Sequence, residues 1–268
     1  CDFTVTQLAE DRFWIVTGTA FGTHDRAWIS SHAGDGVLVE DVTSRWACVG
    51  LWGPKAREIL APCTPDDLSF GYMNARSITV GDVPVRAMRV TYVGELGWEL
   101  YCPMEFGGAL WRTLWEAGAP QGLLAGGYRA IDSLRLEKGY RVWGADITPD
   151  DNPYEGGLGF AVKRDKPFLG SDALDGDRPA RRLCCLVLAD PRSVALGNEP
   201  VRAGGEICGR VTSGGYGYTV GASIAYAYLP AEHGATGTEV AVEVFGEWID
   251  GAVRGEPLFD PDGARVRG

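Results

Sequence analysis

Lysine is scarce in this 268-residue sequence, and acidic residues outnumber basic ones. The lysines are Lys55, Lys138, Lys163 and Lys166, so arginine carries almost all of the positive charge. The formal net charge is −11. A protein of that charge does not attract nucleic acid or an anionic membrane through a broad electrostatic surface, so we expect neither as a partner.

Metal-binding and redox motifs are missing as well. The three histidines have no ligand spacing to one another or to the seven cysteines, and the sequence has no C-x-x-C pair. We therefore expect no bound metal. Most cysteines lie in apolar stretches, which favours reduced, buried thiols and a cytoplasmic protein. Cys184 and Cys185 lie in the middle of one such stretch and are expected in the core.

The sequence contains no nucleotide-binding or hydrolase motif. The glycine clusters near 204 and 214 lack the strand–G-x-G-x-x-G–helix context of a flavin or nicotinamide site. There is no P-loop lysine motif, no G-x-S-x-G elbow, no apolar run of membrane-spanning length and no signal-peptide pattern. What remains is a globular composition with 45% hydrophobic residues.

The character of the chain changes in a polar linker near 170–179. The sequence predicts an α+β region over 1–177 and an all-β domain over 178–268. Short apolar strands separated by Gly/Pro turns predict an antiparallel barrel or sandwich of the Greek-key type in the second part. Its expected strands are 181–189, 199–202, 205–213, 222–229, 238–246 and 248–254.

Helices and strands alternate in the first part. We expect helices over 20–32, 54–60, 103–117 and 126–138, the last ended by Gly139. Trp111 and Trp115 share one helix face and are expected to pack on the sheet, while Arg135 and Glu137 are expected to form a structural pair. The expected strands are 1–8, 12–17, 37–42, 45–51, 76–81, 84–93, 98–102 and 158–162.

One connection stands out for chemistry. Glu95 lies in Gly-Glu-Leu-Gly between the expected strands 84–93 and 98–102, which reads as a β-hairpin. A carboxylate held between two strands can accept two parallel hydrogen bonds from a planar, guanidine-like edge, such as the 2-amino-4-oxo edge of a pterin. The alternative interpretation is a solvated turn residue that binds nothing.

Four motifs, in order along the chain, carry a resemblance to a known family. They are Tyr92-Val-Gly-Glu-Leu-Gly-Trp-Glu-Leu-Tyr101, Asp132-Ser-Leu-Arg-Leu-Glu-Lys-Gly-Tyr140, Asp151-Asn-Pro-Tyr-Glu-Gly-Gly-Leu-Gly-Phe160 and Gly209-Arg-Val-Thr-Ser-Gly-Gly-Tyr-Gly-Tyr218. Together they resemble the folate-binding aminomethyltransferases, the glycine cleavage T-protein family, and most closely the C-terminal parts of dimethylglycine and sarcosine dehydrogenases and oxidases. The resemblance implies a ring-like α+β fold around tetrahydrofolate, followed by a β-barrel.

The resemblance also assigns site residues. The Y-x-G-E motif places the pterin-binding carboxylate on Glu95, with Tyr92 and Met88 lining the pocket on one strand face. Tyr128 is a further candidate for folate binding. Asp2 corresponds to the acid of a Gly-Ile-x-x-Asp motif and is the candidate catalytic residue, beside positive charge that develops on the donor. The alternative for Asp2 is a solvated terminal residue.

The implied activity is one-carbon transfer. An aminomethyl or imine donor would give 5,10-methylenetetrahydrofolate, within a dimethylglycine- or sarcosine-type N-demethylating system. The implied partners are folate, a small methylated-amine donor, and an FAD-dependent oxidoreductase domain or subunit; FAD itself is expected only in a domain preceding Cys1, together with a first family segment. The alternatives are a non-catalytic folate-binding or assembly module and a tetrahydrofolate-dependent O- or S-demethylase.

Overall fold

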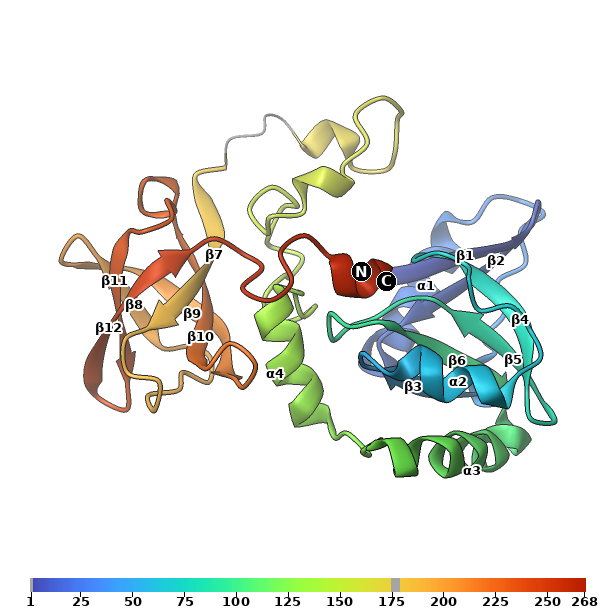
Figure 1. Ribbon diagram of the computed structural model, residues 1–268. Helices are drawn as coiled ribbons and strands as arrows, with labels where there is room; N and C mark the ends of the chain where they lie inside the picture. Colours follow the sequence, from blue (N-terminus) through green and yellow to red (C-terminus); the bar gives the residue numbers. More distant parts are fainter. Residues whose placement is uncertain (1, 175–178) are drawn as a thin grey trace. The chain divides into compact units, whose positions relative to one another are not determined.

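The computed structural model describes residues 2–174 and 179–268 (Figure 1). The chain forms two compact units. One contains the residues up to Thr91 together with 95–125 and 265–268, and the other contains 92–94 and 126–264. The boundary expected at 177 lies outside the described residues, so the division into 1–177 and 178–268 stays a prediction.

The first unit is built on a four-stranded antiparallel sheet in the order β3-β6-β5-β4. Alternate residues of the central strand β6, namely Trp98, Leu100 and Cys102, are fully buried on one face. Leu60 of α2 and Leu110 of α3 join the same core cluster, so these helices cover that face. The elements are β3 (Trp46–Trp52), α2 (Ala56–Leu60), β4 (Ala75–Val80), β5 (Val83–Met88), β6 (Gly97–Pro103) and α3 (Gly107–Gly118).

A two-stranded hairpin, β1 (Phe3–Ala9) and β2 (Arg12–Thr17), packs near the opposite face and is followed by α1 (Gly22–His32). The ring of Trp14 lies 4.9 Å from the rings of both Trp46 and Tyr101. Because an isolated two-stranded hairpin is marginally stable in water, we expect these aromatic contacts to stabilise β1 and β2 against the sheet.

Gly97 marks the closest approach of two strands in this sheet. A Cβ atom built on Gly97 would lie 2.1 Å from the main-chain oxygen of Leu51. We expect Gly97→Ala to lower the free energy of unfolding by about 1–3 kcal/mol, since the strands would have to separate. The control is Gly108→Ala in α3, where the nearest atom, Nη1 of Arg112, would be 3.7 Å away. Chemical denaturation of both variants checks this, and equal stability would contradict it.

The second unit contains a closed barrel of six strands in the order β10-β7-β12-β11-β8-β9, as the family resemblance implies. Every strand pair in it is antiparallel, and the inward residues form one apolar core that includes Leu186, Val211 and Val242. The strands are β7 (Arg181–Leu188), β8 (Pro200–Ala203), β9 (Glu206–Gly217), β10 (Ala222–Pro230), β11 (Glu239–Val244) and β12 (Glu247–Arg254).

Helix α4 (Tyr128–Lys138) packs on the outside of this barrel through Leu136, which shares a buried cluster with Ile224 and Tyr226. Gly139 ends the helix in a left-handed conformation with φ of 74°, as predicted. The short helix α5 (Ala264–Arg267) closes the chain.

The expected pair of Arg135 and Glu137 is wrong. Residues two apart on a helix do not face each other. Arg135 instead donates to Asp146 at 2.7 Å, and Glu137 accepts the main-chain N–H groups of Thr219 at 2.6 Å and of Val220 at 3.1 Å. Both side chains therefore fix α4 to neighbouring segments of the same unit.

Three further expectations are wrong. Residues 37–42 form no strand, and Leu38 is 88% exposed there. The segment 158–162 contains a 3₁₀ turn, Gly159–Ala161, in place of a strand. Trp111 and Trp115 do not pack into the sheet; they stack on each other at 6.0 Å and are 47% and 38% exposed. Local apolar composition alone did not separate buried from exposed positions here.

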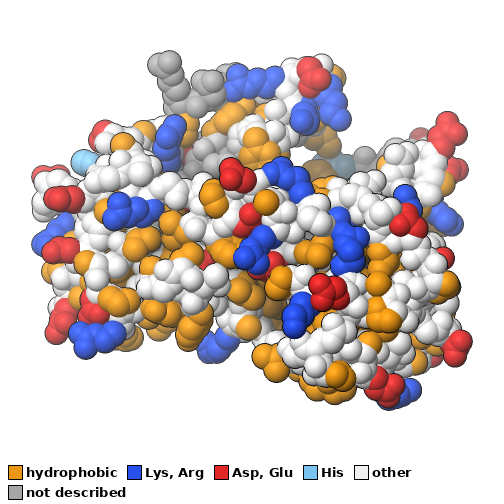
Figure 2. Space-filling view, in the orientation of Figure 1, with side chains coloured by type: hydrophobic (Ala, Val, Ile, Leu, Met, Phe, Trp, Pro, Cys, Tyr) orange, Lys and Arg blue, Asp and Glu red, His pale blue; other side chains and the backbone are white. Residues whose placement is uncertain are grey.

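Acidic, basic and apolar side chains are interspersed on the face of the molecule in Figure 2. Within the described residues, none of the helices is long and apolar enough to span a membrane. The cytoplasmic location and the absence of a membrane partner stay predictions.

Candidate functional site

Glu95 lies in an irregular connection between β5 and β6. Strand β5 ends at Met88, and β6 begins at Gly97, so the expected strand through Val93 is wrong. The reason is local: the N–H of Val90 donates to the carbonyl of Met88, and the carbonyl of Val90 accepts the indole N–H of Trp52 at 3.0 Å. Glu95 therefore sits in a hairpin with a longer loop, and strand pairing does not fix its side chain.

The carboxylate of Glu95 binds an arginine. Nη1 of Arg265 donates to Oε1 of Glu95 at 3.1 Å, and the two residues are 170 positions apart in the chain. The Glu95 side chain is 15% exposed, whereas that of Arg265 is 50% exposed. The carboxylate is thus largely removed from water and oriented toward planar N–H donors, which is the chemistry that recognition of a pterin edge requires.

Met88 and Asp2 belong to the same unit as Glu95. Met88 is buried, at 2% exposure, and its sulfur lies 3.9 Å from the hydroxyl of Thr6 on β1. Asp2 immediately precedes β1 and is exposed. The folate-binding role of Met88 and the catalytic role of Asp2 stay predictions.

Tyr92 and Tyr128 lie in the other unit. The hydroxyl of Tyr92 donates to the carbonyl of Arg141 at 2.6 Å, and its ring stacks on Tyr140 at 5.9 Å. Because Tyr92 lies beyond the end of β5, the expected shared strand face with Met88 is wrong. Tyr128 opens α4 and is 87% exposed. Their roles in folate binding stay predictions.

A second buried carboxylate, Asp25 on α1, was not anticipated. It is 1% exposed and accepts a hydrogen bond from the hydroxyl of Thr17 at 2.5 Å. Burial raises the pKa of Asp25, but the hydrogen bonds from Thr17 and from His24 outweigh it and hold that pKa below its usual value. These contacts tie α1 to β2, and we assign Asp25 a structural role.

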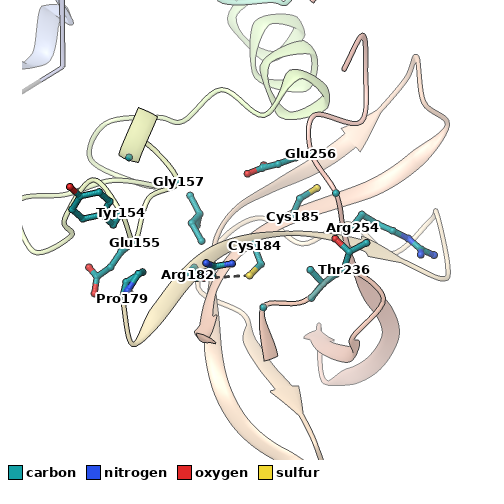
Figure 3. Close-up of a pocket in the computed structure, with 15 residues that line it drawn as sticks. Tyr154, Glu155, Gly157, Pro179, Arg182, Cys184, Cys185, Thr236, Arg254 and Glu256 are labelled. Carbon is teal, nitrogen blue, oxygen red and sulfur yellow. Dashed lines mark hydrogen bonds between the residues drawn. The ribbon is translucent and has the colours of Figure 1, made fainter. Parts of the chain in front are cut away.

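The barrel unit has a cavity of about 380 Å³ (Figure 3). Burial, with the nearby Glu256 carboxylate, raises the pKa of Cys184 to about 11 and that of Cys185 to about 12. Thiols with such pKa values are poor nucleophiles at neutral pH, which agrees with the core role expected for them. Glu256 at the cavity is held by Arg141, with Nη1 of Arg141 3.1 Å from Oε2. Neither of these thiols, nor the Glu256 carboxylate, is therefore an activated group.

Sequence reasoning missed Arg265. The residue lies in Ala-Arg-Val-Arg near the end of the sequence, a pattern with no motif character. Only the fold brings it to Glu95. Among residues 2–174 and 179–268, no group of three or more His, Cys, Asp or Glu side chains could hold a metal ion.

Comparisons with known proteins match both parts of the chain. The model of the GCVT N-terminal domain matches residues 1–166, and that of the glycine cleavage T-protein C-terminal barrel domain matches residues 181–260. Dimethylglycine dehydrogenase of Mus musculus mitochondria is 36% identical over 99% of this chain and 32% of its own length. The 4-methylaminobutanoate oxidase (formaldehyde-forming) of Paenarthrobacter nicotinovorans is 39% identical over 100% of this chain and 33% of its own length.

The chain thus spans about a third of the length of these oxidoreductases. It covers a larger share of the length of the shorter relatives. The aminomethyltransferase of Symbiobacterium thermophilum is 37% identical over 96% of this chain and 72% of its own length. The crystal structure of the glycine cleavage system aminomethyltransferase T from Bartonella henselae superimposes with a TM-score of 0.82, at 28% identity, over 97% of this chain and 72% of that one. The chain belongs to the glycine cleavage T-protein family of aminomethyltransferases.

Proposed function

We propose that this chain binds tetrahydrofolate and transfers to it a one-carbon unit from an aminomethyl or imine donor, giving 5,10-methylenetetrahydrofolate. Membership of the aminomethyltransferase family supports folate-dependent transfer. The single observation that carries the proposal is the hydrogen bond between Arg265 and Glu95, 3.1 Å long. It demonstrates that this carboxylate accepts a planar N–H donor, the type of group that a pterin edge presents.

The residues of the chain fit that ligand in a specific way. Glu95 is largely buried, so water competes little for its carboxylate. A hydrogen bond to it therefore contributes more to binding than one to an exposed carboxylate would. Tetrahydrofolate would supply the nitrogen atoms that accept the one-carbon unit. Asp2 would supply a negative charge beside the positive charge of the donor.

An FAD-dependent oxidoreductase domain or subunit would produce the donor from a small methylated amine such as dimethylglycine or sarcosine. The names of the longer relatives, dehydrogenases and an oxidase, support this part of the proposal. FAD is proposed only for that other domain or subunit. A transfer assay with different donors determines which amine supplies the one-carbon unit.

A second candidate function is a non-catalytic folate-binding or assembly module. The exposure of Asp2 favours it, because an exposed carboxylate is well solvated and stabilises a neighbouring positive charge only weakly.

The test is a transfer assay with the intact protein, anaerobic tetrahydrofolate and the oxidoreductase part supplied. Dimethylglycine, sarcosine and a methyl sulfonium compound are compared as donors. We expect 5,10-methylenetetrahydrofolate from one of the amines and none from the sulfonium compound. Folate binding without product from any donor would favour the non-catalytic module, and product from the sulfonium compound would favour an S-demethylase.

A further inference from the structure

The C-terminal residues are held by two arginines. Arg89, which is 1% exposed, donates to the main-chain oxygens of Val266 at 3.2 Å and of Gly268 at 2.5 Å. Arg57 donates to the same oxygen of Gly268 at 2.9 Å. Both guanidinium groups lie over the ring of Trp98, at 5.3 and 5.4 Å from its centroid. We call these three side chains, Arg57, Arg89 and Trp98, the tail clamp.

The clamp is anchored in the core of the first unit. Trp98 is fully buried in the central strand β6, and the second nitrogen of the Arg89 fork donates to the carbonyl of Phe70 at 3.2 Å. Burial and the neighbouring Arg57 guanidinium lower the pKa of Arg89 from its usual value. Placing two guanidinium groups together and partly out of water is unfavourable unless their N–H groups donate hydrogen bonds to acceptors. Here Nη2 of each arginine donates to the C-terminal main chain, and Nη1 donates to the carbonyl of Phe70 or Leu68.

The clamp sets the position of Arg265. Val266 is buried, at 7% exposure, so the backbone next to Arg265 is held in place. From there the guanidinium of Arg265 reaches Glu95. A fixed backbone lowers the conformational entropy that a long, half-exposed side chain loses when it forms such a contact.

Glu95 needs a partner of this kind. It lies in a connection without strand pairing, yet its side chain is only 15% exposed. Burying a carboxylate is unfavourable unless a counter-charge or hydrogen-bond donors accompany it. Arg265 provides both from outside the loop.

We propose that Arg265 is a positioning residue for folate binding, which it supports by holding the Glu95 carboxylate in place through their hydrogen bond. The inference rests on the proposed function, in which Glu95 receives the pterin edge. The tail clamp, which holds the main chain at Val266 and Gly268, then supports the contact between Arg265 and Glu95. Arg265 acts through Glu95 and need not contact the ligand.

The experiment is calorimetric titration of the intact protein with anaerobic tetrahydrofolate. For Arg265→Gln we expect affinity to fall about 3- to 10-fold, in the range for a partly exposed charged hydrogen bond. Arg265→Lys is expected to recover part of the loss, since it keeps the charge and a donor. Arg267→Gln, which removes the same charge two residues later, is the matched control and should bind as the wild type does.

A double-mutant cycle separates positioning from a general structural effect. If Arg265 acts through Glu95, Arg265→Gln should have no further effect in the Glu95→Gln background. Unchanged affinity in the single Arg265→Gln variant would overturn the inference. So would tighter binding, because it would mean that Arg265 competes with folate for the carboxylate.

The same titrations distinguish this inference from the proposed function. If the wild type binds no tetrahydrofolate, the proposed function fails and the inference fails with it. If the wild type binds and Glu95→Gln weakens binding while Arg265→Gln does not, only the inference fails. A midpoint of thermal unfolding equal to that of the wild type would exclude loss of fold as the cause of weaker binding by Arg265→Gln.

Discussion

Replacing Asp146 by alanine is expected to lower the free energy of unfolding by about 3–5 kcal/mol, the range for removing one partner of a buried ion pair. Asp146 is 1% exposed. It accepts hydrogen bonds from Arg135 at 2.7 Å, Ser213 at 2.6 Å, Thr212 at 2.5 Å and the main-chain N–H of Val142 at 3.0 Å. The variant would leave the Arg135 guanidinium buried without its main counter-charge.

Chemical denaturation followed by circular dichroism measures this loss. The matched control is Asp132→Ala, because Asp132 also faces Arg135 but at 3.8 Å and with a side chain that is 61% exposed. We expect that control to change stability by less than about 1 kcal/mol. Similar losses of unfolding free energy in the two variants would mean that burial of the Asp146 carboxylate is not what stabilises α4, which carries Arg135, on the barrel.

Replacing Asp2 by asparagine is expected to lower the rate of one-carbon transfer by about 100-fold or more while folate affinity stays unchanged. The size follows from losing one preorganised charge at a reacting centre, and asparagine keeps the shape of aspartate. Single-turnover measurement of 5,10-methylenetetrahydrofolate, paired with calorimetric titration, separates the two quantities.

Asp11→Asn is the control for this variant, since Asp11 is an exposed acid at the turn between β1 and β2. It should transfer at the wild-type rate. Equal activity of Asp2→Asn and the wild type would remove Asp2 from the chemistry. Folate binding without transfer, in the wild type as well, would leave the non-catalytic module as the function.

The strands of the barrel were predictable from the sequence because each is short and apolar and is followed by a turn that contains glycine or proline; the choice of a barrel over a sandwich came from the family resemblance. Strand β10 illustrates this: it is a short run of mostly buried apolar residues that ends at Pro230. The left-handed end of α4 at Gly139 was predictable for a similar reason, since glycine adopts that conformation without strain. The ends of these strands and of α4 are set by residues that are adjacent in the sequence.

The failures share a different cause. The connection 89–96 has the composition of a strand, but the carbonyl of Val90 accepts the indole N–H of Trp52 and so does not pair with a neighbouring strand. Arg135 pairs with Asp146, eleven positions away, through a turn whose path the sequence does not specify. Such side-chain hydrogen bonds depend on tertiary packing, which local propensity does not encode.

The candidate site was predictable in part. The motif around Glu95 pointed to a carboxylate in a hairpin, and the structure places Glu95 in the loop between paired strands β5 and β6. Its arginine partner was out of reach, because residues 170 positions apart have no detectable relation in a single sequence. Family resemblance supplied the ligand, and geometry supplied the partner of the carboxylate.

The central claim is that Glu95 receives the pterin edge of tetrahydrofolate. Titration calorimetry of Glu95→Gln beside the wild type tests it most directly, because glutamine keeps the size of the side chain and removes its charge. We expect binding to weaken by about 1–3 kcal/mol, the range for a charged hydrogen bond lost in a largely buried site. Identical affinity in the two proteins would contradict the claim and leave Glu95 as a structural partner of Arg265.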